Sequence, residues 1–266
     1  MSGPEISVAI ITKNEEDKIL SCLESVKFAG QIVVVDSGSA DDTVRIARDF
    51  GCDVFVEDWK GFGAQKQSAI DKCRNPWVLV LDADERIPSA TESKIIGISG
   101  SGGLRGTAAG YSFPRKNFFQ GRWIRHMGWW PDRVARFFQK GRGRMSDNAV
   151  HESVIIDGPV EILDCPIEHF TESDLGKILL KINQYSTLGA EQEFSKGRKC
   201  SVWEAAIRAE LAFFQNYVVR LGFLDGRQGF TLSMTDAINK FSKYAKLSAL
   251  NMEAKKRNDR SDNSHN

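Results

Sequence analysis

Two carboxylates separated by one residue, Asp82 and Asp84, come directly after a run of five apolar residues. That run, WVLVL at residues 77–81, is typical of a strand buried on both faces. Ligands gather at the carboxyl ends of strands in open α/β sheets, so the pair lies where such folds bind substrates. Carboxylates suit Mg²⁺ or Mn²⁺, and such an ion often bridges to a substrate phosphate. A polar turn after a strand is the competing explanation, because Asp is common in turns.

The first 86 residues alternate between strand patterns and helix patterns. Predicted strands cover residues 6–11, 31–35, 52–56 and 77–81, and predicted helices separate them. This alternation predicts βαβ units and a mostly parallel sheet. Glu15 and Asp36 follow the first two strands as Asp82 follows the fourth. We therefore expect three carboxylates to meet at one edge of the sheet.

The later chain differs in character. Residues 97–110 are rich in Gly and Ser and predict a surface loop, and short strands are expected in residues 110–113, 133–139, 150–156 and 160–163. Residues 118–130 are dense in aromatic and cationic side chains, and we interpret them as an elaboration of the sheet. The predicted organisation is an α/β domain over residues 1–172, a helical region over residues 173–250 and a disordered tail over residues 251–266.

Charge and cysteine content limit the possible environments. The net charge is +1, but residues 195–257 hold twelve Lys and Arg against five Asp and Glu, a surplus of +7. This surplus of positive charge fits either contact with an anionic surface or a solvent-exposed helical face. No nucleic-acid partner is expected. Five cysteines without a Cys-x-x-Cys pair indicate reduced thiols in a cytoplasmic protein. No apolar run approaches the ~18 residues that span a bilayer, so we expect a soluble or membrane-surface protein.

Several common classes of enzyme are excluded by missing motifs. Gly61 and Gly63 lack the third glycine and the position after the first strand that a dinucleotide fingerprint needs. The chain contains neither a Walker A pattern nor a Gly-x-Ser-x-Gly elbow. A phospho-acceptor regulatory domain would also place acids at strand ends, but it would be shorter.

Three motifs in order resemble family 2 glycosyltransferases of the GT-A fold. They are IITKNE at residues 10–15, VVVDSGSADDT at residues 33–43 and LDAD at residues 81–84. The resemblance implies a nucleotide-diphosphate sugar as donor and Mg²⁺ or Mn²⁺ as cofactor. It implies that Thr12, Glu15, Asp36, Lys66 and Asp82 bind the donor. Asn14, Arg133 and Arg136 complete the set of predicted substrate-binding residues. Asp36 would accept a hydrogen bond from a uracil imide, Lys66 would face the donor, and Asp84 with Asp82 would hold the metal.

Later motifs resemble one group within that family, the lipopolysaccharide core β-1,4-glucosyltransferases. They are PDRVARFF at residues 131–138, VHE at residues 150–152 and GFLDGRQG at residues 222–229. The resemblance implies transfer of a hexose, with glucose from UDP-glucose favoured, onto a lipopolysaccharide-core-type glycan. A lipid-linked acceptor would place the enzyme at the inner face of the cytoplasmic membrane.

Inverting sugar transfer needs a carboxylate that takes the proton of the acceptor hydroxyl. We predict Glu152 as this base, with Asp132 as its rival. His169 is either a third metal ligand, after Asp84 and Asp82, or a hydrogen-bonded structural histidine. Arg133 and Arg136 fit either phosphate contacts or salt bridges.

Aromatic side chains leave two further questions open. Trp123, Trp129 and Trp130 suit stacking on sugar rings and also ordinary packing. Five aromatic residues of the C-terminal region are flanked by Arg208, Arg220 and Arg227. They fit either a helix at a membrane interface or packing onto the catalytic domain. The members of this set are Trp203, Phe213, Phe214, Tyr217 and Phe223.

The sequence thus predicts a GT-A α/β fold with a helical C-terminal region, acting as an inverting, metal-dependent hexosyltransferase. One alternative keeps the fold and changes the acceptor to a capsule, an exopolysaccharide or a protein. The other is a nucleotide-binding module without turnover, which the intact Asp82 and Asp84 pair and the available Glu152 argue against.

Overall fold

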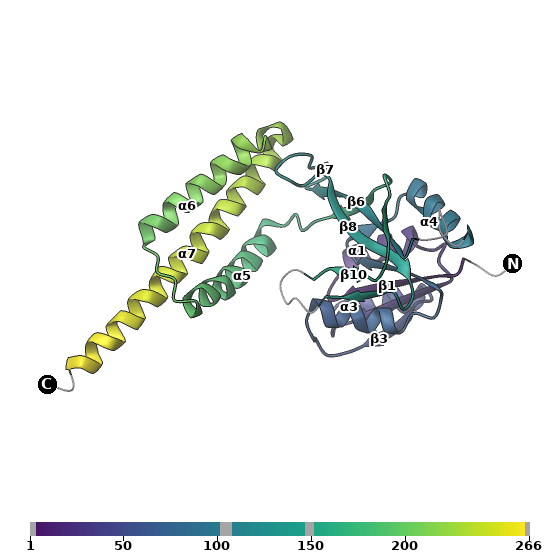
Figure 1. Ribbon diagram of the computed structural model, residues 1–266, viewed down its shortest axis with the longest axis horizontal. Helices are drawn as coiled ribbons and strands as arrows, with labels where there is room; N and C mark the ends of the chain where they lie inside the picture. Colours follow the sequence, from purple (N-terminus) through teal and green to yellow (C-terminus); the bar gives the residue numbers. More distant parts are fainter. Residues whose placement is uncertain (1–3, 102–107, 147–151, 264–266) are drawn as a thin grey trace. The chain divides into compact units, whose positions relative to one another are not determined.

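The computed structural model describes residues 4–101, 108–146 and 152–263 (Figure 1). The chain divides into two compact units, one of residues 1–118 and 131–171 and the other of residues 119–130 and 172–266. The segment 119–130 belongs to the same compact unit as the helices, and it also contributes β7 (Arg122–Trp123) to the sheet, as the interpretation from sequence expected. No helix within the described ranges is both long enough and apolar enough to cross a bilayer.

The first unit is an α/β structure built on one large sheet. Its first half contains β1 (Ile6–Thr12), α1 (Glu16–Ser25), β2 (Gln31–Asp36), α2 (Thr43–Asp49), β3 (Asp53–Val56), α3 (Phe62–Asp71) and β4 (Trp77–Asp82). Its second half contains β5 (Glu85–Arg86), α4 (Ser89–Ser101), β6 (Gly110–Phe119), β8 (Asp132–Gln139), β9 (Gly143–Met145), β10 (Val154–Ile156), β11 (Val160–Ile162) and β12 (Ile167–Phe170).

The strand order of the sheet is β3-β2-β1-β4-β8-β6-β12-β5. The first four of these strands run parallel to one another, and β12 and β11 run parallel to β6. Strand β8 is antiparallel to both of its neighbours, β4 and β6. The predicted α/β class with a mostly parallel sheet is confirmed.

Side chains of β1 alternate between two cores, as the two-residue period of a strand requires. Ile6, Val8 and Ile10 pack in the core that also contains buried residues of α1, α2 and α4. Ala9 and Ile11 pack in the other core, with buried residues of α3. Both faces of the sheet are therefore covered, which explains why the central strands are apolar throughout.

One predicted loop is a helix. Residues 97–101 complete α4, whereas their glycines and serines predicted a loop, and residues 102–107 lie outside the described residues. Ile95 and Ile98 are fully buried against the sheet core. Tertiary burial of this apolar face outweighs the low helix propensity of Gly97 and Gly100.

The second unit contains β7 (Arg122–Trp123), α5 (Leu175–Ser195), α6 (Val202–Phe214) and α7 (Gly226–Asn263). A π-helical segment (Gln215–Val219) and a 3₁₀ turn (Gly222–Asp225) connect α6 to α7. Helices α5 and α6 both pack along α7 (Figure 1). Residues of all three helices surround the buried Tyr244 and Leu247.

The glycines of GFLDGRQG permit the close turn between α6 and α7. A Cβ atom at Gly229 would collide with the carbonyl oxygen of Gly222. Gly226 has φ of +64°, which favours a residue without a side chain. The turn therefore needs glycine for structural reasons.

Helix α7 continues past Leu250 to Asn263, where the sequence predicted a disordered tail from Asn251. Residues 252–257, MEAKKR, are all good helix formers. Their polarity shows that this end of the helix is not part of a core, but it does not end the helix.

Candidate active site

The carboxyl ends of β1, β2 and β4 adjoin because the three strands are parallel neighbours. Thr12 at the end of β1 is level with Asp36 at the end of β2. Ile11 of β1 is level with Asp82 at the end of β4. The expected meeting of acidic strand ends at one edge of the sheet is therefore present.

The loops after β1 and β2 are tied together by hydrogen bonds. The backbone N–H of Asn14 donates to Ser39 Oγ at 2.8 Å, and Asn14 Oδ1 accepts from the N–H of Ala40 at 2.8 Å. Asn14 adopts a left-handed φ of 54°, which Asn tolerates better than most residues. The Glu15 N–H donates to Thr43 Oγ1 at 2.9 Å, and its carboxylate lies 3.5 Å from Lys18 Nζ. Asn14 and Glu15 thus shape the rim of the predicted nucleoside site.

Asp36 is fully buried and organises its own loop. Its Oδ1 accepts from the N–H groups of Gly38 at 2.9 Å and Ser39 at 2.8 Å, and its Oδ2 accepts from Ser39 Oγ. The predicted hydrogen bond to a uracil imide would have to use a remaining lone pair of this carboxylate.

A network of ion pairs surrounds Asp82. Its Oδ1 lies 2.8 Å from Lys66 Nζ, and its Oδ2 lies 2.7 Å from Arg136 Nη2. The same Lys66 Nζ lies 3.5 Å from Glu152 Oε1. Burial alone would raise the pKa of Asp82, but Arg136 and Lys66 outweigh burial and hold it well below its usual range. The structure therefore gathers four predicted site residues, Asp82, Lys66, Arg136 and Glu152, into one cluster.

A β-bulge places Arg136 in this cluster. The register of β6 against β8 passes from Tyr111–Phe137 to Ser112–Ala135, so Arg136 has no residue opposite it. Bulges redirect side chains and occur often beside active sites. Glu85 Oε1 accepts from Arg136 Nη2 at 2.8 Å, and burial of the guanidinium is outweighed by Glu85 and Asp82, which raise its pKa. Arg136 is thus bound by carboxylates, whereas Arg133 on the same strand is exposed.

Two buried polar atoms of the predicted donor-binding set lack a hydrogen-bond partner among the described residues. They are Thr12 Oγ1 and Arg136 Nε. Because buried polar groups are nearly always paired in native proteins, such atoms at a strand-end site need explanation. A polar ligand is one explanation that fits both.

Asp84 pairs with His169. Its Oδ2 lies 3.4 Å from His169 Nε2, and His169 Nδ1 lies 2.7 Å from Asn117 Oδ1. An amide oxygen accepts only, so this bond assigns a proton to Nδ1 and leaves Nε2 as the ring nitrogen that could bind a metal. That is the tautomer a metal-binding histidine requires.

Asp84 and His169 are the two side chains that could hold Mg²⁺ or Mn²⁺. No three His, Cys, Asp or Glu side chains within the described residues gather around one point. Asp82, predicted as a second ligand, is instead paired with two cations. One carboxylate and one imidazole suit an ion that keeps positions for water and for substrate phosphates, as Mg²⁺ and Mn²⁺ do.

Asp132, the rival base, is held by other side chains. Its Oδ2 lies 2.6 Å from Arg115 Nη2 and 3.3 Å from Asn117 Nδ2. Glu152 contacts the single cation Lys66 within the described residues, at 3.5 Å, and residue 151 of the VHE motif lies outside them. Glu152 therefore has fewer side-chain partners among the described residues than Asp132.

Sequence reasoning missed Glu85, Arg115 and Asn117. Glu85 is fully buried, accepts the Asp82 N–H at 3.0 Å and contacts both Arg136 and Arg115. Its position directly after Asp84 was an available signal. Asn117 had no local signal, because its contact with His169 depends on the pairing of β12 with β6.

The thiol of Cys22 lies beneath the strand end, 3.6 Å from the carbonyl oxygen of Asp82. Burial, together with Glu85, Asp84 and Asp82, raises the pKa of Cys22 well above its usual value. The thiol is therefore neutral and unsuited to nucleophilic chemistry. All five cysteines are free thiols, in agreement with the prediction from their number and spacing.

This fold, with acids at adjacent strand ends and helices on both faces of the sheet, is that of a GT-A glycosyltransferase. The family model "Glycosyl transferase family 2" matches residues 7–156, and the chain belongs to this family.

Relatives match over most of the chain. The lipopolysaccharide core biosynthesis glycosyltransferase LpsC of Rhizobium meliloti (strain 1021) is 29% identical over 254 residues, covering 91% of this chain and 91% of LpsC. An uncharacterized glycosyltransferase of Rickettsia typhi is 30% identical over 261 residues, covering 94% of this chain and 89% of the relative. The solved structure of S. aureus TarS 1–349 with UDP-GlcNAc has a TM-score of 0.45 and 13% identity, covering 94% of this chain and 91% of that one.

Proposed function

We propose that this chain is an inverting, metal-dependent hexosyltransferase that uses UDP-glucose and acts on a lipopolysaccharide-core-type glycan. The observation that carries the proposal is the cluster at the strand ends, in which Lys66 joins Asp82 to Glu152. Membership of the glycosyltransferase family supports the reaction class. The likeness to LpsC, a lipopolysaccharide core enzyme by its name, supports the acceptor class.

In the proposed reaction an acceptor hydroxyl attacks the anomeric carbon of the donor sugar. A new glycosidic C–O bond forms as the bond from that carbon to the diphosphate breaks, and the configuration inverts. Glu152 takes the proton of the hydroxyl. The nucleoside lies along the ends of β1 and β2, near Thr12, Asn14, Glu15 and Asp36.

Negative charge that develops on the diphosphate must be stabilised in the transition state. Asp84 and His169 would hold Mg²⁺ or Mn²⁺, and the bound ion supplies that stabilisation as a Lewis acid. Lys66 keeps Asp82 ionised and orients it, and Arg136 does so from the other side. Arg133 is exposed, so its guanidinium can meet a phosphate of the donor or of the acceptor.

Nucleotide binding tests the proposal directly. In thermal unfolding of the full chain, UDP with Mn²⁺ should raise the Tm, whereas GDP and CDP should raise it less. UDP without metal should also give a smaller shift, because the diphosphate is then held without the ion. Absence of a response to every nucleotide, with and without Mn²⁺, would contradict the proposal.

We further propose that the second unit binds an anionic membrane surface. Five large apolar residues recur along α6 and the segment after it, spaced by four, four, three and four positions, as on one face of a helix. They are Trp203 (78% exposed), Ile207 (56%), Leu211 (62%), Phe214 (55%) and Val218 (42%). Such a stripe beside the basic surplus of residues 195–257 has the composition of an interfacial helix.

The structure divides the aromatic set predicted for the interface. Phe213 and Tyr217 stack at 5.3 Å and contact Phe230, so they pack within the unit. Trp203 and Phe214 are exposed. Arg208 is bound to Glu204 at 2.6 Å, whereas Arg220 and Arg227 are exposed.

Flotation with liposomes tests the membrane proposal. The full chain should float with vesicles that contain anionic lipid at low salt, and high salt should weaken binding because it screens the basic residues. Trp203→Ser with Leu211→Ser should reduce the bound fraction by about tenfold or more, since each buried side chain contributes roughly 1.5–3 kcal/mol. Leu20→Ser is a matched control, because Leu20 is half exposed and lies on α1. Equal binding by the double variant and the wild type would contradict the proposal.

A further inference from the structure

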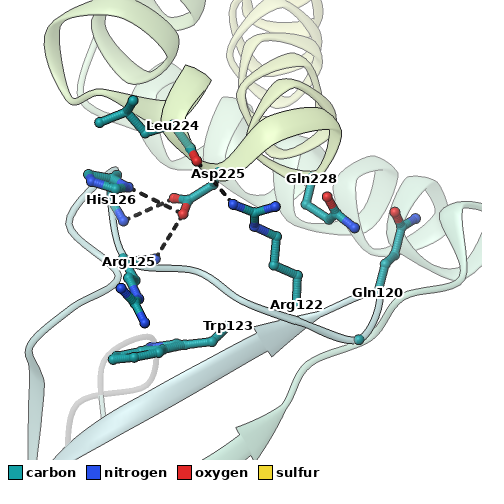
Figure 2. A pocket seen from close by; sticks show the side chains of 9 residues that line it. Gln120, Arg122, Trp123, Arg125, His126, Leu224, Asp225 and Gln228 are labelled. Carbon is teal, nitrogen blue, oxygen red and sulfur yellow. Dashed lines mark hydrogen bonds and ion pairs between the residues drawn. The ribbon is translucent and has the colours of Figure 1, made fainter.

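The second unit contains a cavity of about 640 Å³ between segments 120–126 and 224–228 (Figure 2). Its volume suits a ligand the size of one or two sugar residues. Every lining residue belongs to the second unit. The proposed function assigns no role to this cavity.

Asp225 forms one wall of the cavity and holds it together. Its Oδ1 accepts from the backbone N–H of Arg125 at 3.2 Å, and its Oδ2 accepts from that of His126 at 3.0 Å (Figure 2). His126 Nδ1 lies 3.2 Å from Oδ1, and Asp225 is 1% exposed. The carboxylate is therefore bound to the backbone of residues 125–126 and fixes that segment against residues 224–228.

Two arginines line the cavity in defined orientations. Arg122 Nη2 donates to the carbonyl oxygen of Leu224 at 3.1 Å, which anchors one end of its guanidinium. The Arg125 guanidinium stacks on the Trp123 ring at 4.2 Å. Stacking uses the face of the guanidinium, so the N–H groups on its edge remain directed at an in-plane partner. Both arginine residues are exposed to solvent.

Arginines held in this way suit a carboxylate or a phosphate, which guanidinium groups bind through paired N–H···O bonds. The other polar lining groups include the amides of Gln120 and Gln228. Amides donate and accept hydrogen bonds, as binding of sugar hydroxyl groups requires. The combination therefore selects a ligand that is both hydroxylated and anionic.

We infer that this cavity binds an anionic sugar residue of the acceptor glycan, one that carries a carboxylate or a phosphate. That the sugar belongs to the acceptor rests on the proposed transferase function. Binding of the anionic sugar itself rests only on the cavity, Arg122, Arg125 and the two amides.

Calorimetric titration of the full chain tests the inference with glucuronate, glucose 6-phosphate, glucose and inorganic phosphate. Glucuronate or glucose 6-phosphate should bind, and the stronger of the two identifies the anionic group. Arg122→Gln with Arg125→Gln should weaken that binding at least about tenfold, because bonds to charged groups are lost. Arg125→Gln alone provides the same test if the double variant does not fold. Arg227→Gln is the matched control, since Arg227 is exposed on the same unit and does not line the cavity.

Wild-type affinity in the double variant, or binding of neither anionic sugar to the wild type, would overturn the inference. If inorganic phosphate binds as tightly as the anionic sugars, the ligand need not be a sugar and the inference is overturned. If glucose binds as tightly as they do, the ligand need not be anionic and the inference is likewise overturned. The UDP and Mn²⁺ thermal shift is measured on the same variants and should be unchanged. If the wild type lacks that shift yet binds the anionic sugar through the arginines, the proposed function fails and the cavity assignment stands.

Discussion

Replacing Asp84 by alanine is expected to lower kcat for sugar transfer by about 10²- to 10³-fold, since one group that stabilises transition-state charge commonly contributes that much. Asp84 is the carboxylate at the strand end that lies 3.4 Å from His169 Nε2. Removing it leaves a single protein ligand for the proposed ion. The fold should persist, because Asp84 is partly exposed and its side chain lies outside the Asp82 ion-pair network.

The measurement is turnover of UDP-glucose with Mn²⁺, combined with the thermal shift by UDP at increasing Mn²⁺. In Asp84→Ala the metal-dependent part of the shift should disappear, while the Tm without ligand stays close to that of the wild type. Asp164→Ala is the control, because Asp164 is an exposed carboxylate on the same unit. Wild-type turnover in Asp84→Ala would remove Asp84 from the proposed metal site.

Local sequence patterns were sufficient to predict the frame of the site. Apolar runs such as residues 77–81 define strands, and their alternation with helices requires parallel neighbours whose carboxyl ends share one edge. Thr12, Asp36 and Asp82 lie at that edge as a consequence. These predictions hold because each depends on the spacing of apolar residues within a stretch of about ten residues.

The partners of the charged residues were not predictable in this way. Lys66 was expected to face the donor, and Arg136 to meet either a phosphate or a salt-bridge partner, but the sequence did not indicate that both would bind Asp82. The position of Arg136 depends on a bulge in the pairing of β8 with β6, and the contact of His169 with Asn117 depends on the pairing of β12 with β6. Register between distant strands is a tertiary property, so composition identifies these side chains without identifying their neighbours.

The packing of segment 119–130 was likewise not predictable from its composition. It was expected to elaborate the sheet, and it does contribute β7, but Phe119, Ile124 and Met127 are also buried in a cluster with Ile178 and Leu232. Apolar composition predicts that such residues are covered, but not which element covers them. The cavity lined by Arg122 and Arg125 joins this segment to residues 224–228, and sequence patterns did not indicate that these two stretches lie together.

Glu152→Gln is expected to lower kcat by about 10²- to 10⁴-fold, the range that a positioned general base contributes. Glutamine keeps the size of the side chain and its contact with Lys66 but does not accept a proton at neutral pH. The KM for UDP-glucose and the thermal shift by UDP with Mn²⁺ should change little, because the base acts on the acceptor hydroxyl. Loss of kcat with donor binding retained distinguishes a base from a residue that only binds the donor.

Asp132→Asn is the decisive comparison, because Asp132 is the other carboxylate proposed for this role. Its carboxylate is held 2.6 Å from Arg115 Nη2, which leaves it less able to turn toward an acceptor hydroxyl. We therefore expect Asp132→Asn to retain far more turnover than Glu152→Gln when the two variants have similar Tm. The reverse order would assign the base to Asp132 and leave Glu152 as a partner of Lys66. Near-normal turnover in both variants would place the base on a residue outside this pair.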